Sequence, residues 1–281
     1  MEYSDKQISI LYVDDEALLL DLTKRYLEKT GDFSVETESS AKNGLKKIKE
    51  KKYDAVISDY KMADMDGLEL LRTIRDEGNN IPFIIFTGRG REEVAVEALN
   101  EGADYYLQKG GKPKVQFGEL QNLVRQAVAK KKAESELLEH QQRLEEIINF
   151  LPDATFAIDK EGKVIVWNRA IEEMTGIPVS EMLGKGEYEY SVYFYGRRRP
   201  MLINLILDND LKNQYSYPNI NSKNGDKLYT DILLPNFRNN EVYMWFIASP
   251  LYSQEGDITG AIESIRDITH IKLMEKALGD N

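Results

Sequence analysis

Cysteine is absent from the 281 residues of the chain. Its absence excludes disulfide bonds, cysteine-ligated metals and thiol chemistry, and it is in keeping with a reducing compartment. Long apolar runs are absent too: no segment approaches the roughly 20 residues that cross a bilayer. The first residues also lack the basic and apolar regions of a signal peptide. We therefore expect a cytoplasmic protein with no membrane span.

Positive charge is in the minority. The 37 lysine and arginine residues are outnumbered by 48 aspartate and glutamate residues, which gives a net charge of -11 at pH 7. A surface of this sign repels phosphate backbones, and no basic recognition helix is evident, so we expect no nucleic acid as a partner. Hydrophobic residues make up 42% of the chain, which is typical of a globular protein, and the length suits two domains.

The first half of the chain alternates short apolar segments with amphipathic ones. Segments typical of strands lie at 8–13, 33–35, 53–58, 82–86 and 105–107, and helical patterns lie at 17–27, 41–48, 68–74, 94–99 and from about 117 onward. Such alternation predicts an α/β flavodoxin-like fold, in which five parallel strands carry helices on both faces. In sheets of this kind the functional site lies beyond the carboxyl ends of the strands.

Polar side chains follow the ends of four predicted strands. Asp14 and Asp15 come after the first strand, and Asp59 comes after the third. Thr87 ends the fourth strand, and Lys109 comes shortly after the fifth. Carboxylates gathered at one edge repel one another unless a cation lies between them, and an all-oxygen site suits Mg²⁺. One carboxylate could then attack phosphorus, while the metal, the lysine and the threonine stabilise the transferring phosphoryl group.

Simpler interpretations exist for each of these residues taken alone. An aspartate or threonine after a strand often caps the next helix, and a loop lysine is often only exposed to solvent. The segment from Asp64 to Gly67 also resembles the nucleophile motif of haloacid-dehalogenase-type phosphatases and part of an EF-hand loop. However, the strand has already ended at Asp59, and the EF-hand glutamate is missing. We expect Asp66 and Gly67 to turn the chain into the following helix.

Residues 5 to about 128 resemble a response-regulator receiver domain, and we expect the domain to span residues 1–128. The resemblance rests on the acidic pair, Asp59, Thr87-Gly88, Lys109, and the runs Met62 to Gly67 and Gly102 to Tyr106. The resemblance implies catalytic roles for Asp59, Thr87 and Lys109. It also implies that Mg²⁺ is bound by Asp14, Asp15, Asp59 and the Tyr60 carbonyl. Thr87 and Tyr106 would form a switch pair, and Lys61 and Arg89 would tune the lifetime of the phosphoryl group. One departure is Gly110, which stands where the family usually has proline, so we expect a more mobile loop after Lys109.

The last helical pattern of the first half continues far beyond a normal fifth helix. Residues spaced alternately by three and four are apolar near both of its ends and polar in the middle: Leu120, Leu123, Ala127, Lys130, Glu134, Leu137, Gln141, Leu144, Ile148 and Leu151. This seam predicts a coiled coil in a homodimer, with residues 129–151 as a helical linker. A single solvated helix is the alternative interpretation. Pro152 is expected to end the helix.

The second half has a different pattern. Segments 155–158 and 163–167 predict a hairpin, helical pieces follow at 169–175 and 200–207, and strands are expected at 227–234, 242–248 and 259–266, with a turn at Asn224-Gly225. This order predicts an α+β domain with an antiparallel sheet. The runs 151–185 and 260–269 resemble the opening and the close of a PAS domain. We therefore expect a PAS domain at 152–272 and the start of an exit helix at 273–281.

The resemblance to PAS domains implies a sensor or a dimerisation module, and the ligand stays open. The lack of cysteine excludes a flavin–thiol photosensor. His140 and His270 are expected to be exposed, which disfavours haem. The aromatic stretch from Tyr188 to Tyr195 could line a cavity, although packing is the commoner role of such residues.

Together these features predict phosphorelay signal transduction. A partner histidine kinase would phosphorylate Asp59 in a Mg²⁺-dependent step, and the signal would pass through the helical linker to the PAS domain and on to an output protein. The sequence shows no kinase catalytic features, so apart from the phosphoryl transfer of the receiver itself we expect no enzyme. The alternative is that the chain forms the N-terminal receiver–PAS portion of a larger sensor histidine kinase.

Overall fold

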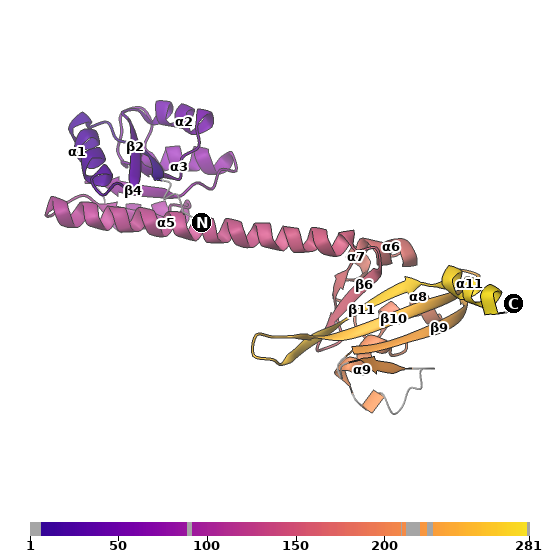
Figure 1. Cartoon of the computed structure of the whole chain (residues 1–281). Helices are drawn as coiled ribbons and strands as arrows, with labels where there is room; N and C mark the ends of the chain where they lie inside the picture. The colour runs from indigo at the N-terminus through magenta and orange to yellow at the C-terminus, as the bar shows by residue number, and fades with distance from the viewer. Residues whose placement is uncertain (1–6, 89–91, 209, 212–219, 224–226, 280–281) are drawn as a thin grey trace. The chain divides into compact units, whose positions relative to one another are not determined.

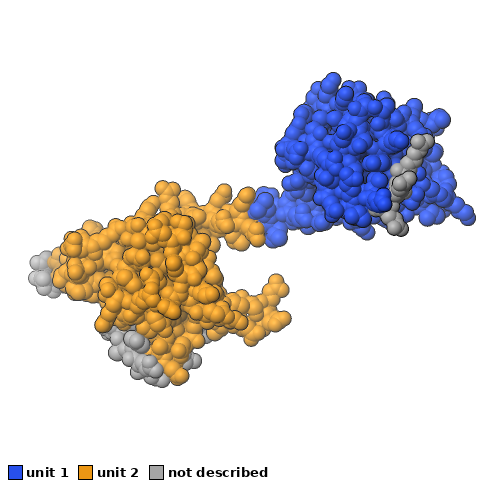
Figure 2. Space-filling model, turned by 180° about the vertical axis from the view of Figure 1, so that it is seen from behind, with its two compact units in different colours: residues 1–140 blue, residues 141–281 orange. Residues whose placement is uncertain are grey.

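The computed structural model describes residues 7–88, 92–208, 210–211, 220–223 and 227–279 (Figure 1). The chain divides into two compact units, residues 1–140 and 141–281, which Figure 2 shows in different colours. This division lies inside one long helix, so the finer predicted boundaries at 128, 151 and 272 stay predictions. In the described part of the chain, no helix has both the length and the apolar character needed to cross a membrane.

The first unit is a parallel five-stranded sheet flanked by helices. Its strands are β1 (Ile8–Val13), β2 (Phe33–Glu38), β3 (Ala55–Ser58), β4 (Phe83–Thr87) and β5 (Tyr105–Gln108); its helices are α1 (Ala17–Glu28), α2 (Ala41–Glu50), α3 (Gly67–Asp76), α4 (Glu92–Asn100) and the first part of α5 (Pro113–Phe150). The strand order is β2-β1-β3-β4-β5, with every neighbouring pair parallel. This order confirms the predicted flavodoxin-like fold, and its switch point lies between β1 and β3.

Alternate residues of β1 enter two separate cores, one on each face of the sheet. Leu11 and Val13 pack in a cluster that contains the apolar side of α3. Ile10 and Tyr12 pack on the opposite face with α1 and the start of α5. The two-residue period of a strand produces this division. As a result, every second residue of β1 is directed toward the same side of the sheet as α5.

The turn after β3 brings the chain back against the sheet. The carboxylate of Asp66 accepts a hydrogen bond from the Glu69 amide at 2.7 Å, and the Glu69 carboxylate accepts one from the Asp66 amide at 3.0 Å. This capping box begins α3, as expected for Asp66 and Gly67. A Cβ atom on Gly67 would lie 2.3 Å from the Asp59 carbonyl oxygen, so only glycine allows this close approach.

Helix α5 begins at Pro113, four residues before the predicted start, and ends at Phe150, two residues before Pro152. Proline is well suited to a first helical position because its fixed φ angle matches the helix. Leu120 and Ala127 of the predicted seam are buried in the first unit, whereas Leu137 and Leu144 are exposed. The early part of the seam therefore belongs to the core of the first unit. Any pairing through this seam is limited to its distal part.

The second unit is built on a six-stranded antiparallel sheet. Its strands are β6 (Ala154–Asp159), β7 (Val164–Trp167), β8 (Asn221–Lys223), β9 (Lys227–Phe237), β10 (Asn240–Tyr252) and β11 (Ile258–Asp267), in the order β7-β6-β11-β10-β9-β8. Short helical elements follow β7: α6 (Arg169–Thr175), α7 (Val179–Met182), η1 (Glu189–Ser191), α8 (Val192–Tyr195) and α9 (Leu202–Leu207). Helix α11 (Thr269–Gly279) begins four residues before the expected exit helix. The predicted turn at Asn224-Gly225 lies outside the described residues.

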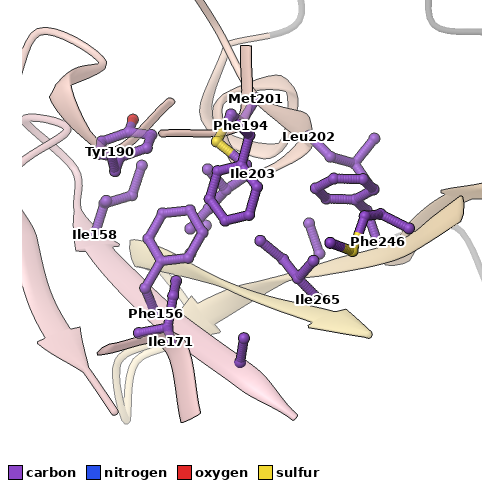
Figure 3. Close-up of a cluster of buried hydrophobic side chains, with 14 of the residues drawn as sticks. Phe156, Ile158, Ile171, Tyr190, Phe194, Met201, Leu202, Ile203, Phe246 and Ile265 are labelled. Atoms are coloured by element: carbon purple, nitrogen blue, oxygen red, sulfur yellow. The ribbon is translucent and has the colours of Figure 1, made fainter. Parts of the chain in front are cut away.

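Aromatic and aliphatic side chains from the sheet and from the short helices fill the core of this unit (Figure 3). Tyr190 lies 5.0 Å from Phe156 between ring centroids, and Phe194 lies 6.2 Å from Phe246. These residues of the predicted aromatic stretch therefore pack in the core. His140 and His270 are both exposed, as expected.

Asn168 fixes the junction between the end of α5 and the second sheet. Its side-chain oxygen accepts hydrogen bonds from the Thr155 and Ile171 amides at 2.8 and 3.1 Å. Its side-chain amide donates to the Ile148 and Asp153 carbonyl oxygens at 3.2 and 3.0 Å. The side chain is fully buried, so these bonds replace all of its contacts with water. The last turn of α5 is thereby tied to β6 and α6.

A matched pair of substitutions tests the two environments along α5. Leu120 is fully buried, whereas Leu144 is 60% exposed. We expect Leu120→Ala to lower the free energy of unfolding of the first unit by about 2 to 5 kcal/mol, because it leaves a cavity under the sheet. Leu144→Ala should change it by less than about 0.5 kcal/mol. Native-state hydrogen exchange of the β1 and β3 amides measures the difference, and equal losses in the two variants would contradict the assignment.

Glu263 of β11 is a fully buried carboxyl group in the second unit. Its Oε2 atom accepts a hydrogen bond from the Ile203 amide at 2.7 Å, and its Oε1 atom has no hydrogen-bond partner among the described residues. Burial raises the pKa of this carboxyl group to about 8. The group therefore carries its proton at neutral pH in the folded protein.

This protonation makes the stability of the second unit depend on pH. The unfolded chain loses the proton near 4.5, whereas the folded state keeps it until about pH 8, so the free energy of unfolding should fall as pH rises between these values. Glu263→Gln should remove most of this fall, because the amide oxygen still accepts the Ile203 hydrogen bond and has no proton to lose. Both tryptophans of the chain, Trp167 and Trp245, lie in this unit, so urea unfolding followed by tryptophan fluorescence reports on it. Glu255→Gln, at an exposed turn, is the control and should keep the wild-type slope.

Candidate functional site

The ends of β1 and β3 place two carboxylates side by side at the carboxyl edge of the first sheet. The Asp59 amide donates to the Val13 carbonyl at 2.8 Å, and the Asp14 amide donates to the Glu38 carbonyl at 3.1 Å. These bonds continue the sheet by one residue beyond each strand. Asp14 is fully buried and Asp59 is 8% exposed, so both charges are largely removed from water. Buried carboxylates of this kind require hydrogen-bond donors or a nearby cation to compensate for the loss of water.

Lys109 supplies a cation between them. Its backbone amide donates to the Thr87 carbonyl at 2.7 Å, which fixes the residue just beyond β5. Its ammonium group donates to Asp14 Oδ2 at 2.6 Å and to Asp59 Oδ1 at 2.8 Å. The ammonium also lies 5.5 Å from the centre of the Phe86 ring. The lysine, which follows β5, therefore joins two acids that follow β1 and β3.

Further donors surround each carboxylate. Asp14 Oδ1 accepts the Glu16 amide at 2.9 Å, and Asp14 Oδ2 accepts the hydroxyl of Tyr12. Asp59 Oδ2 accepts the Lys61 amide at 2.9 Å. Burial, and then the nearby Asp14 charge, raise the pKa of the Tyr12 hydroxyl well above its ordinary value, so the phenol remains a proton donor. Sequence reasoning missed Tyr12, although the two-residue period of a strand places it on the same face as Asp14.

A cleft of about 670 Å³ opens at this edge. Asp15, Asp59, Lys61, Thr87 and Lys109 all contribute to its lining. Asp15 is exposed, whereas Thr87 is buried in the cleft wall. The structure thus brings together the acid, hydroxyl and ammonium groups that the sequence pattern singled out. A group that enters the cleft meets Asp59 with Lys109 and Thr87 beside it.

Two of the predicted site residues, Tyr60 and Tyr106, are not among the residues that line this cleft. Tyr60 is not part of the cleft lining, and its carbonyl oxygen accepts the Gly67 amide at 2.8 Å. The Tyr106 hydroxyl is buried with no hydrogen-bond partner among the described residues, and burial raises its pKa. Arg89 lies outside the described residues. Tyr106 and Tyr60 both pack against the apolar core on the α3 face of the sheet.

The two acids after Asp59 have structural roles. Asp64 accepts a hydrogen bond from the Ser40 hydroxyl at 2.7 Å, next to the start of α2. Asp66 forms the capping box of α3. Both carboxylates therefore hold loops and helix ends in place. Neither interaction resembles a phosphatase nucleophile or a calcium ligand.

The oxygen atoms of the cleft fit a magnesium ion held by few protein ligands. Within the described residues, no three histidine, aspartate or glutamate side chains are gathered closely enough to hold a metal. Mg²⁺ commonly keeps several waters and uses only one or two carboxylates. Asp15 and Asp59 line the same cleft and could supply these two. Asp14 already accepts three hydrogen bonds, so it has less capacity to bind the metal directly.

Comparison with known families agrees with this fold. Residues 10–125 match the model of the response regulator receiver domain, and residues 142–209 match that of the PAS fold. The chain therefore contains a response-regulator receiver domain that is followed by a PAS fold. Neither matched model is that of a kinase catalytic domain.

Individual relatives match part of the chain. The chain is 35% identical over 126 residues to the transcriptional regulatory protein ZraR of Klebsiella oxytoca. The matched region covers 45% of this chain and 27% of that protein. The chain is also 35% identical over 102 residues to the response regulator MprA of Mycolicibacterium vanbaalenii. Here the matched region covers 36% of this chain and 44% of that protein. The chain thus spans less than half the length of either relative.

One solved structure similar to the chain is a CheY-like receiver domain protein from Methanospirillum hungatei. It has 32% sequence identity and a TM-score of 0.41, and the match covers 44% of this chain and 99% of that one.

Removal of the Lys109 ammonium group, which bridges Asp14 and Asp59, provides a test of the site geometry. Lys109→Met should lower the free energy of unfolding of the receiver by about 3 to 5 kcal/mol, because it leaves two buried carboxylates without their shared partner. Lys112→Met changes an exposed lysine in the same loop and should have little effect. Hydrogen exchange of the receiver amides measures both variants. A Lys109→Met protein as stable as the control would contradict the bridging role.

Proposed function

We propose that the receiver accepts a phosphoryl group on Asp59 from a partner histidine kinase in a Mg²⁺-dependent reaction. The observation that carries this proposal is the position of Lys109, whose ammonium group bonds both Asp14 and Asp59 at the rim of an open cleft. Asp59 lines this cleft while its other oxygen is held by the Lys61 amide. A carboxylate fixed in this way is oriented for attack on a group that enters the cleft.

In the transfer, a carboxylate oxygen of Asp59 forms a bond to phosphorus while the bond from phosphorus to the histidine nitrogen of the kinase breaks. The electron pair of the broken bond remains on that nitrogen. The Lys109 ammonium neutralises charge on the phosphoryl oxygens, and the Thr87 hydroxyl can donate a hydrogen bond to one of them. Bound Mg²⁺ would supply further positive charge to the same oxygens.

The metal ligands that we propose are Asp15 and Asp59, with Asp14 contributing through its negative charge and its hydrogen bonds. The backbone oxygen first expected from Tyr60 is better supplied by Lys61, since Lys61 lines the cleft and the Tyr60 carbonyl is bonded to Gly67. Lys61 also carries a cationic side chain, which supports its predicted effect on phosphoryl lifetime.

We further propose that Thr87 and Tyr106 change position after phosphorylation. The Tyr106 hydroxyl is buried without a hydrogen bond among the described residues, so the side chain has little polar interaction to lose when it moves. Thr87 lies at the end of β4, in the sheet position that neighbours Gln108 of β5. A shift of Thr87 toward the phosphoryl group would open space that Tyr106 could enter.

Helix α5 is the proposed route to the PAS domain. Its first part contributes Leu120 and Val124 to the core beneath the receiver sheet. Its last turn is bonded through Ile148 to Asn168 of the PAS unit. The leucines on the distal half are exposed and could pair with a second copy of the chain. An altered pairing of this kind would change how the protein binds its output partner.

The assignment of Asp59 can be tested with a small phosphodonor. Acetyl phosphate with Mg²⁺ should phosphorylate the wild-type chain, whereas Asp59→Asn should remain unmodified because the amide is a poor nucleophile. Asp64→Asn, in the adjacent loop, is the matched control and should be phosphorylated as the wild type is. Intact-protein and peptide mass spectrometry locate the group. Phosphate on the Asp59→Asn variant, or at another residue of the wild type, would overturn the proposal.

A further inference from the structure

We propose that Tyr12 is a positioning residue that fixes Asp14 and thereby sets the affinity of the receiver for its divalent cation. This inference rests on the proposed phosphorylation of Asp59, and it assigns a role to a residue of the buried strand β1. Tyr12 acts through Asp14, since its side chain does not line the cleft.

The strand itself brings the phenol to the carboxylate. Tyr12 and Asp14 are two residues apart at the end of β1, so their side chains are on the same face of the sheet. Tyr12 is fully buried, and its hydroxyl donates to Asp14 Oδ2. Its ring centre lies 6.5 Å from that of Phe86, the ring near which the Lys109 ammonium also lies. The phenol therefore has little freedom to leave Asp14.

Three donors hold the Asp14 carboxylate from different parts of the fold. The Glu16 amide bonds Oδ1 from the following turn, Lys109 bonds Oδ2 from the cleft, and Tyr12 bonds Oδ2 from the core. An ionised carboxylate has about four acceptor positions. Of these donors, only Lys109 also bonds Asp59. The bond from Tyr12 thus orients Asp14 while the lysine is shared.

Loss of the phenolic oxygen should loosen this arrangement. Asp14 would keep only the Glu16 amide and Lys109, and its carboxylate could rotate toward the lysine. Asp14 acts on the proposed metal ligands from outside, through its negative charge and through the lysine that it shares with Asp59. Removal of a group that orients such an outer partner typically changes metal affinity about 10- to 100-fold. The atoms that react with phosphorus belong to Asp59, whereas the Tyr12 hydroxyl donates its hydrogen bond to Asp14. We therefore expect an effect on cation binding rather than on the transfer at saturating cation.

The test compares the wild type with Tyr12→Phe in the full chain. Isothermal titration with Mg²⁺ alone should give a dissociation constant about tenfold higher for the variant. With acetyl phosphate, the Mg²⁺ concentration for half-maximal phosphorylation should rise to a similar extent. The rate at saturating Mg²⁺ should stay within about twofold of the wild type, because the reacting carboxylate and Lys109 are unchanged.

Tyr53→Phe is the matched control, because it removes a hydroxyl that bonds Glu36 at 2.9 Å in the same domain. This control should leave both the Mg²⁺ affinity and the phosphorylation rate unchanged. Tyr12→Met removes the same donor with a differently shaped side chain, and it serves if Tyr12→Phe fails to fold by circular dichroism. In a folded Tyr12 variant, Mg²⁺ affinity within twofold of the wild type, or tighter binding, would overturn the inference. A wild type that carries no phosphate on Asp59 would instead overturn the proposed function, and the two failures are thus distinct.

Discussion

Two carboxylates that lie side by side in a buried position repel each other, and the receiver is arranged around the relief of this repulsion. Asp14 and Asp59 are adjacent because β1 and β3 are neighbours in the sheet. Lys109 reaches both from beyond β5, and it does so because its backbone is bonded to the end of β4. The shared ammonium offsets this repulsion, and it leaves the Asp59 carboxylate at the rim of a cleft.

The sequence predicted the structure best where a residue pattern is explained by a single structural role, such as an apolar run that forms a buried strand. The apolar runs before Asp14, Asp59 and Thr87 predicted buried parallel strands, and strand order then placed their ends together. Lys109 could be assigned because it followed the fifth such run. Tyr12 was missed since its hydroxyl lies inside an otherwise apolar strand, where a tyrosine is easily taken as core packing. Only the contact with Asp14 distinguishes it.

Predictions were less complete where contacts between distant segments decide the structure. In α5 the spacing of Leu120 and Ala127 suits a coiled coil, yet both residues are buried in the receiver core, because a helix that covers a sheet needs a similar apolar face. In the second unit the strands β6, β7, β9, β10 and β11 were expected from sequence, while β8 and the short helices between α6 and α9 were not all expected. Such short elements have little periodicity of their own, and Phe194 is held by packing against Phe246.

The residues of the proposed phosphorylation site are distant in the chain: Asp14 and Lys109 are 95 positions apart. During synthesis the ribosome releases the acidic residues long before the lysine. The proposed acceptor site is assembled only when the last strand has joined the sheet, so on this proposal an incompletely folded receiver offers a kinase no competent target. The topology would then couple the capacity for phosphorylation to the completion of folding.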